Sequence, residues 1–171
     1  SQYQNTLSYG ISAQLNQMEQ NKLDGITEID DKESSTVETY AQSHVITANY
    51  GEFVPGLRVQ HDSDFGFYSN AKLNWMKDLS LFESVESKLR LSYGQGYRTP
   101  DLKQRFYLFD HSNLGYVIKG NEDLDPEESN NYNMTLTLKK DNTRLEWSAF
   151  YNQYRNKIKT CRINTSDAAD E

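Results

Sequence analysis

Apolar and polar residues alternate with a period of two along much of this chain. From Leu7 to Asn16 the odd positions hold Leu, Tyr, Ile, Ala and Leu, and the even positions hold Ser, Gly, Ser, Gln and Asn. Successive side chains of a β-strand point to opposite faces of the sheet, so this pattern predicts a strand with one apolar and one polar face. The same alternation recurs in five further segments: Leu57–Gln60, Ala71–Trp75, Leu89–Tyr93, Tyr132–Lys139 and Leu145–Asn152.

A less regular run, Val37–Val45, is predicted to pair with Phe53–His61. The sequence therefore predicts about seven strands of roughly 8–15 residues each. Short connections are expected at Lys139–Arg144, Ile46–Glu52 and Lys77–Ser84, and long loops at Gln20–Thr36 and Arg98–Glu127. Short turns on one side and long loops on the other are typical of outer-membrane barrels.

Two folds fit this alternation. In a soluble β-sandwich the apolar faces pack against each other, whereas in a membrane barrel they face lipid and the polar faces line a wet interior. Strand length favours the barrel, as do the basic residues on the polar side and the aromatic residues near strand ends, which resemble interfacial girdles. The basic residues are Arg58, Lys72, Arg90 and Lys139, and the aromatic ones include Tyr9, Tyr40, Trp75, Tyr93 and Tyr151.

The longest connection carries its own local signals. Thr99 is a good helix N-cap, Pro100 suits the first helical position, and Asp101 favours the first turn, so a short helix is predicted near 100–107, from Asp101 to about Tyr107. A short hairpin is predicted within Phe109–Ile118.

Composition and charge narrow the function. The chain has 171 residues, enough for one domain, and its net charge of -7 argues against a nucleic-acid partner. A single cysteine, Cys161, excludes an internal disulfide and a cysteine-based zinc site, and no apolar run approaches the length of a transmembrane helix. The acidic segments Glu28–Glu33 and Glu122–Glu128 are interpreted as solvated loops, with calcium binding as the alternative. No nucleophile elbow, phosphate loop or zinc signature is present, so an enzyme is not expected.

Several segments resemble TonB-dependent outer-membrane receptors. That family shows an aromatic-Arg-Ala-Pro box, then an Asn-Pro-Asn/Asp-Leu box, then Lys-Pro-Glu and a strand. The corresponding residues here are Tyr97-Arg98-Thr99-Pro100, Asn121-Glu122-Asp123-Leu124 and Asp125-Pro126-Glu127. The segments VPGLRVQHDSDFG, LRLSYGQGYRTP and EWSAFYNQYRNKI also resemble the family, so the resemblance extends from about Ser8 to Ile158. Thr99, Glu122 and Asp125 depart from the family pattern.

The resemblance implies an all-β, antiparallel up-and-down meander that forms part of a transmembrane barrel of twenty-two strands. Residues 1–171 would be a partial barrel domain, and the family's plug domain and remaining strands would be absent. It also implies the outer membrane of a Gram-negative bacterium, with lipid, the TonB complex (through the plug) and a surface lipoprotein as candidate partners. No intrinsic cofactor is implied. The transported solute would be scarce, such as an iron carrier in the form of haem or a siderophore. The alternatives are a passive porin or adhesin barrel and a soluble carbohydrate-binding β-sandwich.

The resemblance also singles out candidate ligand residues. In the haem-importing branch of the family, a histidine between the two boxes is an axial iron ligand, and His111 lies at this place. Imidazole and tyrosinate both bind haem iron, so the nearby Tyr107 and Tyr116 are further candidates. The alternative is that His111 is a polar loop residue. Arg98 could bind a carboxylate or phosphate of the solute, or it could be structural and pair with loop acids.

Overall fold

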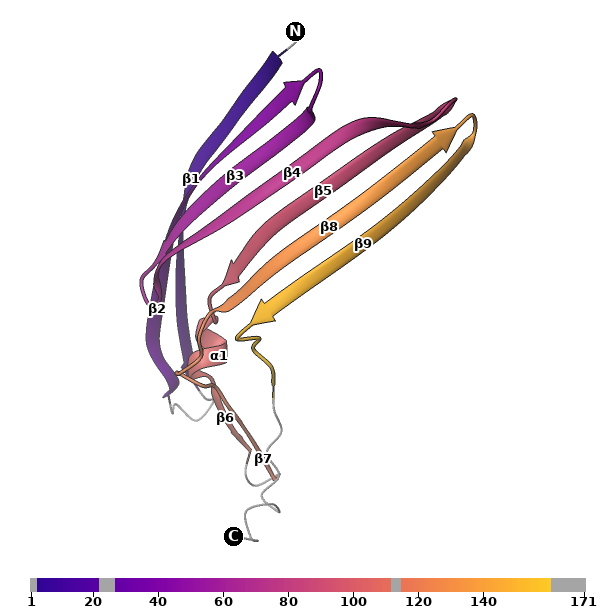
Figure 1. The fold of residues 1–171 in the computed structure, drawn as a ribbon. Helices are drawn as coiled ribbons and strands as arrows, with labels where there is room; N and C mark the ends of the chain where they lie inside the picture. The colour runs from indigo at the N-terminus through magenta and orange to yellow at the C-terminus, as the bar shows by residue number, and fades with distance from the viewer. Residues whose placement is uncertain (1–2, 22–26, 112–114, 161–171) are drawn as a thin grey trace.

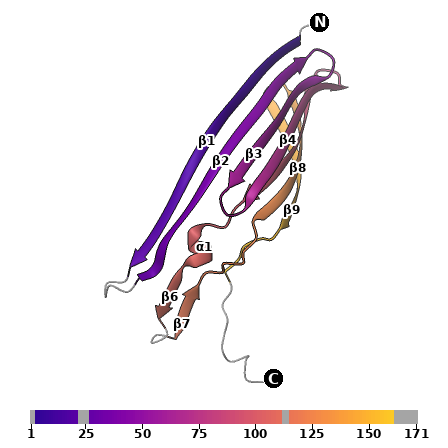
Figure 2. The same cartoon turned by 90° about the vertical axis from the view of Figure 1, so that its left-hand side faces the viewer.

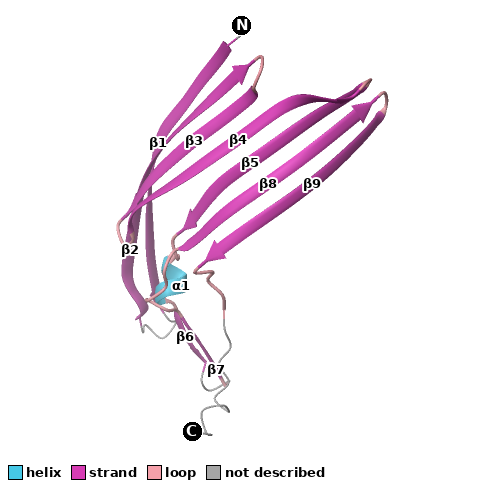
Figure 3. Cartoon of the chain, viewed as in Figure 1, coloured by secondary structure: helices cyan, strands magenta, loops and turns pink. Residues whose placement is uncertain are grey.

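The chain forms antiparallel strands and one short helix in the part that the structure describes (Figures 1 and 3). This computed structural model describes residues 3–21, 27–111 and 115–160. The elements are β1 (Tyr3–Asn21), β2 (Thr27–Thr47), β3 (Gly51–Asp62), β4 (Gly66–Phe82), β5 (Val85–Arg98), α1 (Leu102–Phe106), β6 (Leu108–His111), β7 (Tyr116–Lys119), β8 (Glu127–Lys140) and β9 (Thr143–Arg155). No helix among these described residues is long and apolar enough to cross a membrane.

The main sheet is an up-and-down meander. Its seven strands are ordered β1-β2-β3-β4-β5-β8-β9, and every pairing is antiparallel. The hairpin of β6 and β7 forms a separate two-stranded sheet between β5 and β8 in the sequence. The predicted pairing of β2 with β3 is confirmed, because Val37 lies opposite His61 and Val45 opposite Phe53.

The two ends of the sheet differ. At one end, the short-turn rim, residues 48–50, 83–84 and 141–142 join neighbouring strands. Asp141 adopts a φ of 49°, a left-handed conformation that Asp and Asn tolerate better than most residues. At the other end, the long-loop rim, lie the β3–β4 turn at 63–65 and the long segment 99–126 with α1, β6 and β7 (Figure 1). The predicted division into short turns and a long loop after Arg98 is confirmed.

The prediction of a long loop at Gln20–Thr36 is wrong. β1 continues to Asn21 and β2 begins at Thr27, and the pairing runs on through Gln17 opposite Glu33 and Met18 opposite Lys32. Apart from Leu23, Ile26 and Ile29 the residues of this segment are polar or glycine, so its sequence lacks the alternation that reveals a strand. Cross-strand hydrogen bonds join backbone groups and do not require that alternation. The whole acidic segment Glu28–Glu33 therefore belongs to strand β2 and not to a loop.

Apolar side chains form rows across one face of the sheet. Tyr93, Tyr132 and Tyr151 lie opposite one another on β5, β8 and β9, with neighbouring ring centroids 5.0 and 6.1 Å apart. Towards the short-turn rim the next row is Leu91, Met134 and Ala149, followed by Leu89, Leu136 and Trp147. A row of tyrosines at the border of an apolar band is the arrangement expected at a membrane–water interface.

This apolar face is uncovered in the described part of the chain. Ile11 is 76% exposed and Trp147 53% exposed, whereas Leu102 of α1 is the one aliphatic side chain buried among the described residues. Within residues 3–21, 27–111 and 115–160, only the small β6–β7 sheet accompanies the main one, so these residues do not form the two packed sheets of a sandwich. Such a large exposed apolar surface is typical of a protein that meets lipid or another protein there.

Candidate functional site

The long segment at the rim begins and ends at an ion pair. Arg98, the last residue of β5, lies opposite Glu127, the first residue of β8, and its Nε donates to a Glu127 oxygen at 2.6 Å. The Arg98 guanidinium also donates to the side-chain oxygen of Gln104 at 3.2 Å. The second Glu127 oxygen accepts from the Ile158 backbone N–H at 2.7 Å. The hydrogen bonds from Arg98 and then Ile158 lower the pKa of Glu127, so its carboxylate stays charged and holds the base of the loop together.

Helix α1 starts with a capping box. The Asp101 carboxylate accepts from the Gln104 backbone N–H at 2.7 Å, and the Gln104 side-chain oxygen accepts from the Asp101 backbone N–H at 3.1 Å. The predicted helix is confirmed, but its N-cap is Asp101 and not Thr99. The first helical residue is Leu102, which is 7% exposed, and the capping box of Asp101 and Gln104 defines where the helix begins.

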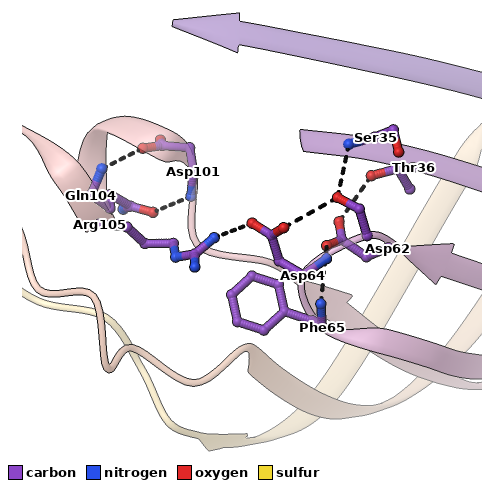
Figure 4. Close-up of polar contacts among 9 residues, drawn as sticks. Ser35, Thr36, Asp62, Asp64, Phe65, Asp101, Gln104 and Arg105 are labelled. Carbon is purple, nitrogen blue, oxygen red and sulfur yellow. Dashed lines mark hydrogen bonds and ion pairs between the residues drawn. The ribbon is translucent and has the colours of Figure 1, made fainter. Parts of the chain in front are cut away.

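The β3–β4 turn is held by one buried carboxylate. Asp62 is 2% exposed and accepts from the Thr36 hydroxyl at 2.9 Å and from the backbone N–H groups of Asp64 and Phe65 at 3.0 and 3.2 Å (Figure 4). The Ser63 N–H donates to a backbone oxygen of β2 at 2.9 Å. Because the carboxylate satisfies donors from both the turn and β2, the turn is rigid and anchored to its neighbouring strand.

Arg105 connects α1 to this turn. Its guanidinium forms an ion pair with Asp64, and it lies 4.9 Å from the centre of the Phe65 ring and 4.7 Å from that of Phe106. The Arg105 side chain is only 15% exposed and that of Asp64 27%. Figure 4 shows Arg105 reaching from α1 to Asp64, which in turn lies beside Asp62. The long segment is thus docked onto a turn that lies about forty residues earlier in the chain, as Arg105 and Asp64 are 41 positions apart.

The β6–β7 hairpin is attached to α1 through its backbone. The Gly120 N–H, just after β7, donates to the Tyr107 carbonyl at 2.6 Å, and the Asn121 N–H donates to the Gln104 carbonyl at 3.0 Å. A Cβ at Gly120 would lie 2.6 Å from the carbonyl oxygen of Arg105, so glycine permits this close approach. Figure 2 shows α1 between the β1–β2 arm and the β8–β9 strands, with the hairpin extending beyond it.

The structure places the predicted ligand residues at different points of this loop. His111 ends β6 and lies opposite Tyr116, the first residue of β7, so the backbones of these two candidates are neighbours. Their side chains lie outside the part that the structure describes. Tyr107 is at the other end of the hairpin, half-buried, with the Lys103 ammonium 5.4 Å from its ring centre. Arg98 lies at the end of β5, where its guanidinium donates hydrogen bonds to Glu127 and Gln104.

The first motif box packs against the wall. Tyr97 stacks on Tyr68 of β4 with ring centroids 3.7 Å apart, and Pro100 is buried. Arg98 makes the ion pair described above. The residues of this box therefore join the end of β5 to β4, through Tyr68, and to β8, through Glu127.

The second box closes the loop. The Asn121 side chain accepts from the Asp123 N–H at 3.0 Å, Leu124 is half-buried and Pro126 is buried. The Pro126 carbonyl accepts from the Asn156 side chain at 3.4 Å. This box returns the chain to β8 and also contacts the segment after β9.

The roles of Asp62, Asp64 and Arg105 were not predicted from the sequence. The Asp-Ser-Asp run at 62–64 after an alternating segment is a turn signal that could have been read. The contact with Arg105 has no local signal, because it depends on how the strands are ordered. No group of three or more His, Cys, Asp or Glu side chains suited to a metal ion occurs in the described ranges.

Comparison with known proteins decides the family. A family model described as TonB dependent receptor-like, beta-barrel, matches residues 1–170. The chain belongs to this family. The predicted family and the predicted antiparallel barrel wall are thereby confirmed, and the soluble sandwich is not the fold of this receptor chain.

Two relatives are ferric siderophore receptors by name. The ferric enterobactin receptor PirA of Pseudomonas aeruginosa is 29% identical in an alignment 117 positions long, which covers 61% of this chain and 15% of PirA. The ferrienterobactin receptor of Escherichia coli K12 is 27% identical in an alignment 150 positions long, which covers 80% of this chain and 19% of that receptor. The matched part of the chain thus spans less than a fifth of the length of these curated relatives.

Solved structures show the same fold. The crystal structure of the siderophore receptor PirA from Pseudomonas aeruginosa matches with a TM-score of 0.65 at 22% identity, covering 86% of this chain and 28% of PirA. A mutant of the ferric enterobactin receptor PfeA from the same organism matches with a TM-score of 0.72 at 21% identity, covering 91% of this chain and 25% of PfeA. The seven-stranded sheet therefore corresponds to a stretch of the wall of such a receptor.

Proposed function

We propose that this chain is part of an outer-membrane receptor that imports a ferric siderophore with energy delivered by TonB. The observation that carries the proposal is the pair of relatives named as ferric enterobactin receptors, of which one aligns with 80% of the chain. The uncovered apolar face, bordered by the row of Tyr93, Tyr132 and Tyr151, supports a wall that contacts outer-membrane lipid.

The long-loop rim supports a role in presenting the solute-binding loop. The ion pairs of Arg98 with Glu127 and of Arg105 with Asp64 fix the base of the β6–β7 hairpin at two points. A loop whose base is fixed loses less conformational entropy when it closes on a ligand, which favours binding. In this proposal, the rim positions the hairpin, the strands form the wall, and TonB acts through a plug domain elsewhere in the receptor.

The test uses the complete receptor that contains this chain. It is expressed in Gram-negative cells that lack their own siderophore receptors, and binding and uptake of ⁵⁵Fe-labelled ferric enterobactin are measured with and without TonB. We expect saturable binding in both strains and uptake only in the strain with TonB. Uptake that is unsaturable and independent of TonB would indicate a passive porin, and the absence of binding would refute the proposed solute.

Haem is a second candidate solute, and the juxtaposition of His111 and Tyr116 at the tip of the hairpin is the observation that favours it. A hemin titration of the complete receptor in detergent, followed by Soret absorbance, tests this role. If His111 is an axial ligand, His111→Ala weakens a saturable one-to-one shift. His44→Ala is the matched control, because His44 lies on a strand and contacts Glu52 at 3.1 Å. Hemin binding that is unsaturable, or that has the same affinity in His111→Ala and His44→Ala, would leave the siderophore as the solute.

A further inference from the structure

One lysine lies among the residues of the apolar face. Lys77 alternates with Trp75 and Leu79 along β4, so its side chain belongs to the face that these apolar residues form. Among the basic residues of the seven described strands, Lys140 and Arg155 share this face but stand at strand ends, and the others lie on the polar face. Lys77 is thus a positive charge between apolar neighbours.

Lys77 has no ionic partner in the part of the chain that the structure describes. The adjacent Asp78 is on the polar face and pairs with Lys88 at 3.4 Å, and across the strands Lys77 lies opposite Leu89. The Lys77 side chain is half-buried. An ammonium group next to hydrocarbon is unfavourable unless an anion or water satisfies it. Because β4 is flanked by β3 and β5 in the sheet, its counter-charge has to come from outside the wall.

The β2–β3 turn ends beside Lys77. Gly51, the first residue of β3, has a φ of 87°, and a Cβ there would clash with the Met76 carbonyl and lie 3.1 Å from Cβ of Lys77. Glycine is therefore needed at this position, and it leaves this flank of the lysine without a covering side chain. The Trp75 indole N–H donates to the Tyr50 carbonyl at 2.8 Å, which holds the turn against β4. Tyr50 and Trp75 are therefore close neighbours of Lys77.

The apolar band crosses the sheet obliquely. One row of paired residues runs from Ala149 of β9 through Trp75 of β4 to Asn5 of β1. Ala149 lies in the middle of the apolar stretch Leu145–Tyr151, whereas Asn5 lies before the apolar stretch Leu7–Leu15, on its short-turn side. Such a drift is expected where the strands tilt by about 35–45° against the axis of a barrel.

This drift places Lys77 at a border of the band. On β4, midway between β1 and β9, the row of Trp75 is close to the border, and Lys77 lies two residues further towards the short-turn rim. The short turns of outer-membrane barrels face the periplasm. Lys, Tyr and Trp are residues that anchor a protein at a lipid–water interface, so Lys77, Tyr50 and Trp75 match the headgroup level of the periplasmic leaflet.

A hollow of about 490 Å³ adjoins Trp75 on the apolar face. It is lined by the row of Trp75, Leu91, Met134 and Ala149 and by the tyrosine row beyond it. Ala149 has the smallest side chain of the row and leaves room between larger neighbours. Trp75 lies two residues from Lys77, about 7 Å along the strand. A positive charge next to an apolar hollow fits an amphiphile with an anionic head.

We propose that Lys77 binds the phosphate of an anionic phospholipid in the periplasmic leaflet, and that an acyl chain of the same lipid lies in the hollow beside Trp75. The phosphate supplies the counter-charge that the chain does not provide, in a charge-assisted hydrogen bond with the ammonium. The lysine stem lies along apolar surface while its charged end reaches the headgroups. The inference rests on the membrane placement in the proposed function and is independent of the solute.

The test cross-links lipid at this site. In the complete receptor, benzoylphenylalanine, a photoreactive residue, replaces Leu79, which is two residues from Lys77 on the same face. The receptor is inserted into phosphatidylcholine vesicles that contain a rising share of radiolabelled phosphatidylglycerol. The label attached to the protein after illumination is measured, and the electrophoretic mobility of unheated samples shows that each variant is folded.

We expect the yield to saturate as the share of phosphatidylglycerol rises. Lys77→Gln should raise the half-saturating share about fivefold, the size of the attraction between one lysine and an anionic lipid surface, and Lys77→Arg should leave it unchanged. Ala149→Phe fills part of the hollow and should also raise this share. Lys140→Gln is the matched control, because Lys140 lies on the same face at the end of β8, outside the site.

Each result bears on a different statement. An unchanged half-saturating share in folded Lys77→Gln or Ala149→Phe receptor would overturn the lipid site. An equal rise in Lys140→Gln would also overturn it, because the attraction would then be diffuse. Cross-linking to a second receptor copy in place of lipid would overturn it too and mark the face as an oligomer contact. A receptor that inserts and binds this lipid but imports no siderophore would refute the proposed solute alone, whereas failure to insert into vesicles would overturn both proposals.

Discussion

The docking of α1 by Arg105 leads to a quantitative prediction. Arg105→Ala removes a charge-assisted hydrogen bond to the turn, of about 1.5–3 kcal/mol, and one cation–π contact with the turn, over Phe65, of about 0.5–1 kcal/mol. Because the Asp64 side chain is 27% exposed, water compensates part of the lost ion pair. We therefore expect α1 and the hairpin behind it to open more readily by about 2 kcal/mol, which is about 30-fold in the opening equilibrium.

Amide hydrogen exchange measures this opening. The N–H groups of Arg105, Tyr107 and Asn121 donate within or onto α1, at 3.2, 3.2 and 3.0 Å. In the complete receptor in detergent, Arg105→Ala should raise their exchange about 30-fold. Arg144→Ala is the control, since it removes an arginine that is 66% exposed and paired with Glu146 at the other rim, and it should leave these amides unchanged.

A double-mutant cycle with Asp64→Ala isolates the contact itself. If the Arg105–Asp64 pair carries the effect, the double variant should exchange little faster than Arg105→Ala alone. Exchange that is unaffected by Arg105→Ala, or additive effects of the two changes, would refute the reasoning that this ion pair docks the helix.

Three further predictions test the loop and the wall. Asp101→Ala removes the N-cap of α1 and should raise amide exchange there about fivefold, corresponding to about 1 kcal/mol, whereas Asp101→Asn should restore most of the protection. The carboxyl of Glu127 has a lowered pKa in the folded chain because Arg98 donates to it, so its stabilisation of the loop base is complete above the ordinary glutamate pKa and disappears as the pH falls through the lower folded value. The protection of amides in 99–111 and 115–126, which is the ratio of the intrinsic to the observed exchange rate at each pH, should therefore fall as the pH drops through the folded pKa of Glu127. A Glu127→Gln receptor whose protection falls in the same way would contradict this assignment. Leu136→Arg, on the apolar face, should destabilise folding into a bilayer by about 2–4 kcal/mol in a denaturant titration, and Thr137→Arg, on the polar face, by much less; equal effects would mean that the faces are assigned wrongly.

The alternating strands could be predicted from the sequence because a period of two in apolar residues is the pattern of a strand with one apolar face. Leu7–Asn16 and Tyr132–Lys139 carry one apolar face, and both lie in strands of the structure. The helix near Asp101 and the hairpin within Phe109–Ile118 were also predicted from local signals, since capping and turn formation involve neighbouring residues. Local sequence patterns were therefore sufficient to predict the elements whose formation depends on neighbouring residues.

The remainder depends on partners that are distant in the sequence. The strand extension of β1 and β2 through Gln17 and Glu33 is stabilised by pairing and has no side-chain pattern of its own. The contact of Arg105 with Asp64 requires α1 to meet a turn that only the sheet order brings near. The ligand roles of His111, Tyr107, Tyr116 and Arg98 remain predictions, because residue types between two motif boxes do not specify which solute a loop meets.

The length of the β1–β2 hairpin has a consequence within the proposed function. Tyr9 belongs to the row of Ala41, Leu57 and Ala71, two residues beyond the row that includes Tyr93, and β1 then continues for twelve more residues to Asn21. At about 3.3 Å per residue, this is about 40 Å of strand. In a membrane-inserted receptor whose long-loop rim faces outward, the hairpin would extend beyond the lipid headgroups. Antibodies, phages and proteases arriving from outside would then contact the hairpin before they reached the opening of the barrel.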